Sequence, residues 1–188
     1  GHLKSTLIKL LKISLPLTPS NNSNRQTGMT TGGFSSKQLL EEEQILKLAS
    51  LTNSDAVEIG EIATTLGNQR KVPIAIQVRI GDWIVFHASL QGSKPENDWW
   101  INRKVSVVKL KQHSTMYERV SAEERGVDWH SENNLPDETH AIHGGAIPLI
   151  TADGFKGSLI ISGLPQVEDH LFAVEVLTEF LARKGEEL

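Results

Sequence analysis

The sequence predicts an α+β domain in which two β-hairpins form an antiparallel sheet and helices pack against it. In the first hairpin, apolar residues alternate with other residues over 74–80, and a Gly-Asp turn leads into a returning strand over 83–89. The second hairpin has strands over 146–151 and 155–162, separated by an Asp-Gly pair that is typical of tight turns. Segments with helical spacing of apolar residues surround both hairpins.

Two helices are expected before the first hairpin. Ser35 and Gln38 have the spacing of a capping box, in which each side chain bonds to the other residue's backbone N–H, so a helix should begin at this point. Asn53 is expected to cap a second helix. Gly67 is expected to end that helix, because glycine adopts the left-handed conformation found after many helices.

A third helix is expected between the hairpins. Ser93 and Glu96 again have capping-box spacing, and Pro95 suits a first helical turn because its missing N–H does little harm there. This helix should run to about Lys111. Residues 112–139 are polar and lack a clear period, so we interpret them as a long loop with one helical turn at most.

The last helix is expected after Gly163 and Pro165. Glu168 and Asp169 then lie in its first turn, where negative charge complements the positive end of the helix dipole. The residues expected on its buried face recur at helical spacing and are Leu171, Val174, Leu177 and Leu181.

Composition limits the classes of protein. The 188 residues, with a mass of 20.7 kDa, suit one domain. The absence of cysteine excludes disulfides, thiolate metal sites and cysteine nucleophiles, and it is compatible with a reducing compartment. A net charge of −4 argues against a nucleic-acid binder, and no apolar run is long enough to span a bilayer.

The first part of the chain differs from the rest. Residues 1–40 carry five basic residues and no acidic one, and residues 16–36 are rich in Ser, Thr, Asn and Gly. We therefore divide the chain into a flexible basic leader, 1–34, and a folded domain, 35–188. A cytoplasmic location follows if the leader is a simple extension, and a mitochondrial one if residues 1–28 act as a transit segment.

His140 and His143 could form a metal site. Three residues apart, they would share one face of a helix and could hold zinc or iron there, but on a strand they would point to opposite faces. The glycines Gly144 and Gly145 favour extended backbone at this point, and we interpret them as a close approach of two backbone segments. Separate hydrogen bonding of each histidine is therefore favoured over a shared metal.

Aromatic and cationic residues also come together in one segment. Trp99 and Trp100 precede Arg103 and Lys104 at helical spacing, an arrangement that could grip a planar anionic ligand by stacking and charge. The alternative is that one tryptophan belongs to the core and that the cations are solvated. Both interpretations stay open from the residues alone.

Four segments of the chain together resemble one family. They read FHASLQG (86–92), NDWWINRK (97–104), HAIHGGAIP (140–148) and SGLPQVEDH (162–170). This set resembles the haem-degrading-domain family, related to the HbpS and GlcG proteins, and is most similar to a widespread cytosolic branch of it. The resemblance implies a profilin-like fold, an antiparallel sheet flanked by helices, and homo-oligomers in which dimers assemble into larger rings. Some relatives bind haem and promote its breakdown or iron release.

The resemblance also carries over individual residues. Those matching the family as ligand-binding candidates are His87, Trp100, Arg103, Lys104, His143 and His170; those matching as structural or capping residues are Gly144, Gly145, Glu168 and Asp169. His140 and Gln91 depart from the family's usual residues, so a paired-histidine site would be peculiar to this chain.

Three hypotheses follow from the resemblance and the residues. In the first, Arg103 and Lys104 bind the propionates of haem, His143 or His170 offers a neutral nitrogen to its iron, and these residues meet around one cleft. In the second, the chain is a non-enzymatic oligomeric scaffold or adaptor with protein partners, for example in chaperone or protein-targeting assemblies. In the third, His140 and His143 hold the metal of a hydrolase.

Overall fold

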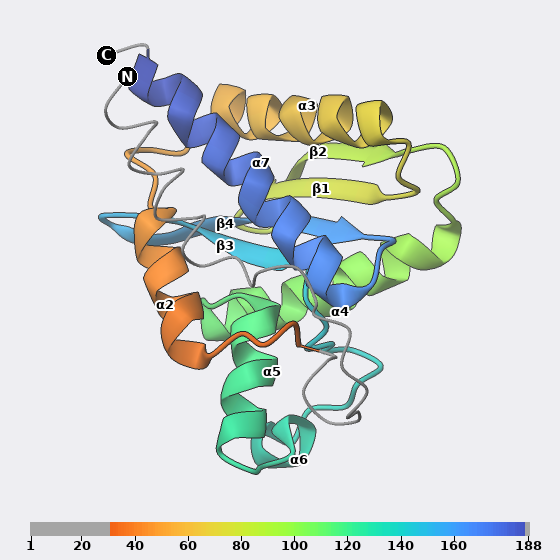
Figure 1. Cartoon of the computed structure of the whole chain (residues 1–188), viewed down its shortest axis with the longest axis vertical. Helices are drawn as coiled ribbons and strands as arrows, with labels where there is room; N and C mark the ends of the chain where they lie inside the picture. Colours follow the sequence, from red (N-terminus) through yellow and green to blue (C-terminus); the bar gives the residue numbers. More distant parts are fainter. Residues whose placement is uncertain (1–30, 187–188) are drawn as a thin grey trace.

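The computed structural model describes residues 31–186, and it forms three layers (Figure 1). The expectations about the basic leader and its address fall on residues 1–30, outside the described part. The helices and strands, in chain order, are α2 (Ser36–Ile45), α3 (Asn53–Arg70), β1 (Ala75–Ile80), β2 (Trp83–Ser89), α4 (Pro95–Lys111), α5 (Thr115–Glu124), α6 (Trp129–Asn133), β3 (Ala146–Thr151), β4 (Gly154–Ser162) and α7 (Gln166–Glu186).

The middle layer is one antiparallel sheet in the order β2-β1-β4-β3. Helices α3 and α7 cover one face of the sheet and α4 covers the other (Figure 1). The larger core lies under α3 and α7, where Ile76 and Leu159 meet residues such as Ile59 and Phe180. A smaller core lies under α4, where Ala75 and Ile160 pack on Ile101, Val105 and Val108. The predicted α+β class and both hairpins are confirmed.

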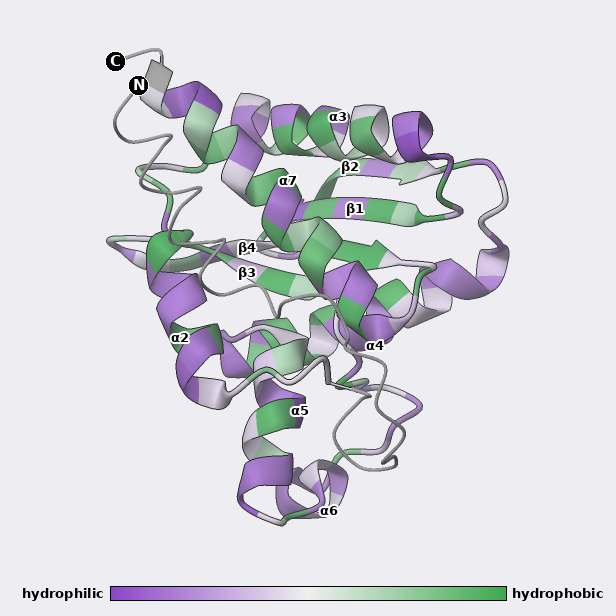
Figure 2. Cartoon of the chain, in the orientation of Figure 1, coloured by the Kyte–Doolittle hydropathy of each residue, from purple (hydrophilic) through white to green (hydrophobic). Residues whose placement is uncertain are grey.

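The helices show the two-sided character that this layering requires. In Figure 2, α3 and α7 each carry both hydrophobic and hydrophilic residues, as expected of helices that cover one face of a sheet. On α7 the buried side includes Phe172, Ala173, Val176 and Phe180 together with the expected Val174 and Leu177, while Leu171 and Leu181 are only partly buried. Within the described residues, no helix is long and apolar enough to span a membrane.

The expected start of α2 is confirmed, and the two helices that follow begin one residue away from the expected caps. The Ser35 capping box is present in full. Thr52, rather than Asn53, caps α3 through a box with Asp55. The expected end at Gly67 is wrong. Gly67 lies within α3 and packs against Leu90, and the left-handed residue that follows the helix is Lys71.

At the start of α4, the predicted Ser93–Glu96 box is wrong. The Asn97 side chain accepts a hydrogen bond from the Lys94 backbone N–H (2.8 Å), and the Ser93 hydroxyl donates to the carbonyl of Leu90 (2.6 Å). Pro95 is the first helical residue and the helix ends at Lys111, as predicted.

The prediction of a long loop over 112–139 is wrong. Helix α5 is capped by Ser114 and α6 by Asp128, whose side chains accept backbone N–H groups of the first turns. These helices and α2 form a group on the α4 side of the molecule (Figure 1), where Met116 and Val120 of α5 pack on Leu39 of α2. The group supports residues 136–145, which run along α4 to the candidate site.

Candidate functional site

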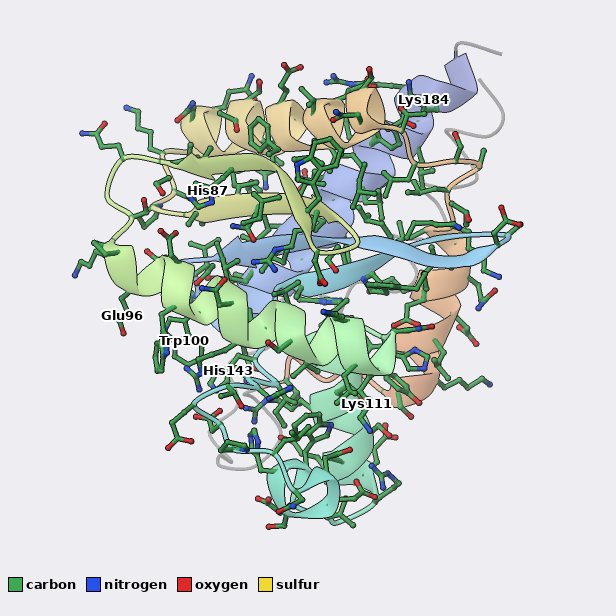
Figure 3. The ribbon with its side chains drawn as sticks, turned by 180° about the vertical axis from the view of Figure 1, so that it is seen from behind. His87, Glu96, Trp100, Lys111, His143 and Lys184 are labelled. Carbon is green, nitrogen blue, oxygen red and sulfur yellow. The ribbon has the colours of Figure 1, made fainter. Side chains whose placement is uncertain are left out.

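An open cleft lies where one side of α4 meets the segment before β3 and the turn between β4 and α7. Its volume is about 280 Å³. Helix α4 contributes Glu96, Asn97, Trp100 and Lys104, and His143 faces them from the segment before β3. Figure 3 shows Glu96, Trp100 and His143 together along this side of α4. The remaining lining residues come from the end of β4 and the start of α7 and are Ser162, Gly163, Leu164, Gln166 and Asp169.

A buried ion pair forms the floor of the cleft. The Lys104 ammonium donates to the Asp169 carboxylate (3.1 Å) and to the carbonyl of Ile161 (2.9 Å), and both side chains are 3% exposed. Asp169 also accepts backbone N–H groups from Gly163 and Leu164. Burial lowers the pKa of Lys104 and raises the pKa of Asp169 to about 6, and their mutual attraction opposes both shifts. The pair joins α4, β4 and α7 at one point.

Gly144 and Gly145 allow the backbone to pass close to this pair. Gly145 has a φ of +130°, and a side chain there would collide with the carbonyl of Ile161 and with the Lys104 ammonium. Gly144 lies against the backbone of Gln166 and donates its N–H to the Gln166 side chain (3.2 Å). Two small residues therefore fix the position of His143, the residue just before them.

His143 is the group most available to a ligand. Its half-buried ring contacts Trp100 edge-on, with centroids 4.7 Å apart, and neither ring nitrogen has a hydrogen-bond partner among residues 31–186. Desolvation lowers the pKa of His143 to about 4, and the positive charges of Arg119, Lys104 and Arg103 add to the shift. The ring is thus neutral at pH 7, with a lone pair free to bind a metal ion or accept a proton.

Arg103 does not line the cleft. Its guanidinium lies 4.0 Å from the Trp99 ring centroid and 4.3 Å from that of Trp100. It is buried, and it bonds to Asp137 through both the carbonyl (2.6 Å) and the carboxylate (2.6 Å) of that residue. Arg103 therefore supports Trp100 from behind, and the expectation that it would meet a ligand beside Lys104 is not met.

His170 and His87 also lie outside the cleft. His170 is fully buried in α7, and its ring shares a 2.7 Å hydrogen bond with Glu42 of α2. His87 lies on β2, away from the cleft (Figure 3), and bonds to Gln77 and Ser89. Of the four histidine and cation candidates expected to converge, the structure brings together Lys104 and His143 and separates Arg103 and His170.

Among the other polar candidates, one lies at the cleft and the others do not. Asp169 is buried in the ion pair, whereas its neighbour Glu168 is exposed. His140 bonds to Thr139 (2.7 Å) and faces Trp129. The described residues contain no group of three histidine or carboxylate side chains that could hold a metal ion, so a His140–His143 hydrolase centre has no third ligand there.

Several lining residues were not singled out from the sequence. Glu96, Asn97, Ser162, Leu164 and Gln166 complete the cleft, and three of them fall in the SGLPQVEDH segment. That segment could have indicated these three residues, because it spans the end of β4 and the first turn of α7, where the cleft lies. Placing Glu96 and Asn97 beside it requires knowledge of how α4 packs on the sheet.

The fold belongs to a recognised class of protein. Residues 51–178 match the family described as "Haem degrading protein HbpS-like", and the chain belongs to that family. A UPF0303 protein of Streptomyces avermitilis is 37% identical over 147 residues, covering 78% of this chain and 90% of that protein. A UPF0303 protein of Schizosaccharomyces pombe is 30% identical, with 78% and 83% coverage.

Solved structures agree on the fold. The Ybr137w protein matches with a TM-score of 0.72 and 26% identity over 94% of each chain. HbpS matches with a TM-score of 0.56 and 14% identity, over 72% of this chain and 92% of that one. The complex of PduOC with haem matches with a TM-score of 0.59 and 16% identity, over 70% of this chain and 94% of that one. At these last two identities the similarity concerns the fold alone.

Proposed function

We propose that this chain binds haem or a related tetrapyrrole at the cleft, with His143 offering its neutral nitrogen to the iron. The observation that carries the proposal is the His143 ring, which is kept neutral and has no hydrogen-bond partner among the described residues. Membership of the HbpS-like family and the fold shared with a haem complex support the same ligand.

The residues present fit haem in donor type and charge. The imidazole of His143 is a common iron ligand, and the indole of Trp100 provides an aromatic wall beside it. Lys104 and Arg119 make the surroundings of His143 positive, which suits an anionic ligand. The cleft volume of about 280 Å³ lies just below the range of about 300–1,000 Å³ seen for ligand pockets, so this chain alone does not enclose a porphyrin. Bound haem would supply the oxygen chemistry of its iron.

Within that site each residue has one task. His143 holds a lone pair toward the ligand and stays unprotonated well below pH 7. Trp100, supported by the Arg103 guanidinium, keeps water away from one side of the imidazole. Asp169 holds the Lys104 ammonium in place as an ion pair at the floor of the cleft, so the hydrogen bonds of Lys104 remain within the protein.

Hemin titration with an absorbance readout tests the proposal. The wild-type chain should give a saturable shift of the Soret band, and His143→Ala should lose it or weaken binding by tenfold or more. His87→Ala is the matched control, because His87 is a partly exposed histidine outside the cleft, and it should bind as the wild type does. A wild-type chain without a saturable shift, or equal binding by His143→Ala, would contradict the proposal.

A second candidate is a non-enzymatic oligomeric scaffold. It is favoured by the number of motif residues that are engaged in internal contacts: Arg103, Lys104, Asp169 and His170 are all buried and bonded to other parts of the fold. The same titration separates the candidates, because a scaffold with an otherwise intact fold would show no saturable hemin spectrum.

A further inference from the structure

Three cationic side chains lie near His143 and act on its pKa, and two of them are already paired within the fold. Lys104 is held in the buried ion pair at the floor of the cleft. Arg103 is buried and bonds to both the carbonyl and the carboxylate of Asp137. At either residue, an acidic group of a ligand would have to displace an internal carboxylate. The third cation, Arg119 of α5, is different.

A backbone contact holds Arg119 beside His143. The Nε–H of Arg119 donates to the carbonyl of Ile142 (3.0 Å), the residue just before His143. Of the charged groups that act on the His143 ring, Arg119 has the largest effect, which agrees with this close position. Arg119 itself lies outside the lining of the cleft. It is therefore placed to meet the part of a ligand that extends beyond the cleft.

Much of the hydrogen-bonding capacity of Arg119 is unused. Its Nη1 approaches the Glu123 carboxylate at 3.5 Å, longer than the usual range of about 2.7–3.2 Å, and this pair is partly exposed to solvent. Its Nη2 has no partner among residues 31–186, and 21% of the side chain is exposed. A guanidinium presents its N–H groups as a planar fork that matches a carboxylate. Arg119 can thus bind a carboxylate without giving up a strong internal bond.

We propose that Arg119 binds a carboxylate of the ligand that His143 holds, and so selects acidic tetrapyrroles over neutral ones. The inference rests on the proposed haem site and assigns the recognition of the acidic group to a residue of α5. A ligand too large for a cleft of about 280 Å³ extends past its lining, and Arg119 lies there beside His143. Arg103 and Lys104, expected from the sequence to bind propionates, instead hold the parts of the fold that shape the cleft.

A purely structural role for Arg119 is the alternative. In that role Arg119 only holds the Ile142 carbonyl, and through it the position of His143. The two roles differ in the ligands that they affect. Loss of a structural contact weakens the binding of every ligand of the site, whereas loss of a carboxylate partner weakens only the binding of ligands that carry a carboxylate.

Absorbance titrations of the full chain with hemin and with hemin dimethyl ester, whose propionates are neutral, separate the two roles. The wild type should bind hemin about tenfold or more tightly than the ester. Arg119→Gln keeps an N–H donor for the Ile142 carbonyl but loses the charge, so it should bind hemin about tenfold more weakly than the wild type and lose the preference for hemin. The matched control is Arg125→Gln, which removes an exposed arginine that is paired with Glu132 at the end of α5. It should keep both the wild-type affinity and the wild-type preference.

The ratio of the two affinities is the decisive quantity, because a general loss of folded protein weakens both ligands equally and cancels in it. If Arg119→Gln keeps the wild-type preference for hemin, or if the wild type binds hemin and its ester equally, the role of Arg119 is overturned and the haem site stands. If the wild type gives no saturable spectrum with either ligand, the haem site itself is overturned, and the role of Arg119 with it.

Discussion

His143 and His170 come from two of the four segments that carry the family resemblance, yet they lie in opposite environments. His143 faces an open cleft, contacts one indole and has no hydrogen-bond partner in the described chain. His170 is fully buried and bonded to Glu42, which joins α7 to α2. The difference shows that a shared sequence motif does not by itself separate ligand-binding residues from structural ones, because burial and hydrogen bonding decide which role a side chain can have.

The largest effect should come from the buried ion pair beside His143. Lys104→Met leaves the Asp169 carboxylate buried without its charge partner, and we expect a loss of about 3–5 kcal/mol in the free energy of unfolding. The control is Lys109→Met, which breaks the exposed pair with Asp82 and should cost less than about 1 kcal/mol. Urea denaturation measures both, and equal losses would show that the buried pair does not hold α4, β4 and α7 together.

His170→Ala should cost somewhat less, roughly 2–4 kcal/mol, because it leaves a cavity and an unpaired Glu42. His143→Ala should lower the free energy of unfolding by about 1 kcal/mol or less, because the ring is half-buried and its removal breaks no hydrogen bond within the described residues. Thermal and urea unfolding of the two variants test the comparison directly. If His143→Ala were the more damaging change, the assignment of structural and ligand roles would be reversed.

The sequence predicted the sheet well because each hairpin has a period of two and a turn pair of known geometry. It failed over 112–139 for a physical reason: the buried side of α5 mixes the polar residues Thr115 and Glu118 with Met116, Val120 and Ala122, which weakens the apolar period of the helix. Caps at Ser114 and Asp128 start α5 and α6 in a stretch of low hydrophobicity.

The candidate site was predicted only in part, since its members are distant in the chain. Trp100 and His143 are brought together by the packing of α4 against residues 136–145, which no local pattern encodes. The same packing hides Arg103 behind Trp100. Residue type indicated that these side chains could bind an anion or a metal, but exposure to the cleft depends on the complete fold.

The low pKa of His143 predicts a pH dependence of the stability of the fold. The folded chain binds a proton at His143 only near pH 4, whereas the unfolded chain does so near pH 6.5. The unfolded state therefore holds more protons between these values, and stability falls as the pH drops through this window. His143→Gln removes this contribution, so the stability difference between wild type and variant should change below pH 6.5 and stay constant above it.

Asp169 does not affect that comparison. Its raised pKa, about 6, makes the folded state bind a proton more readily than the unfolded state, which favours folding as the pH falls. This contribution is present in both wild type and His143→Gln and cancels in their difference. Urea denaturation at pH values from about 7.5 to about 4.5, in steps of about half a unit, measures the difference in unfolding free energy between wild type and variant. A difference that stays constant throughout would contradict a neutral, desolvated His143.

The smallest effect is expected at His87, the histidine of the first motif segment. Its ring bonds to Gln77 and Ser89 at the partly exposed surface of β2, and it approaches Asp98 at 3.6 Å. His87→Ala should therefore cost about 1 kcal/mol or less in unfolding free energy and leave the hemin spectrum unchanged. A hemin spectrum that depends on His87 as strongly as on His143 would contradict this prediction. It would show that ligand binding also involves β2, outside the cleft.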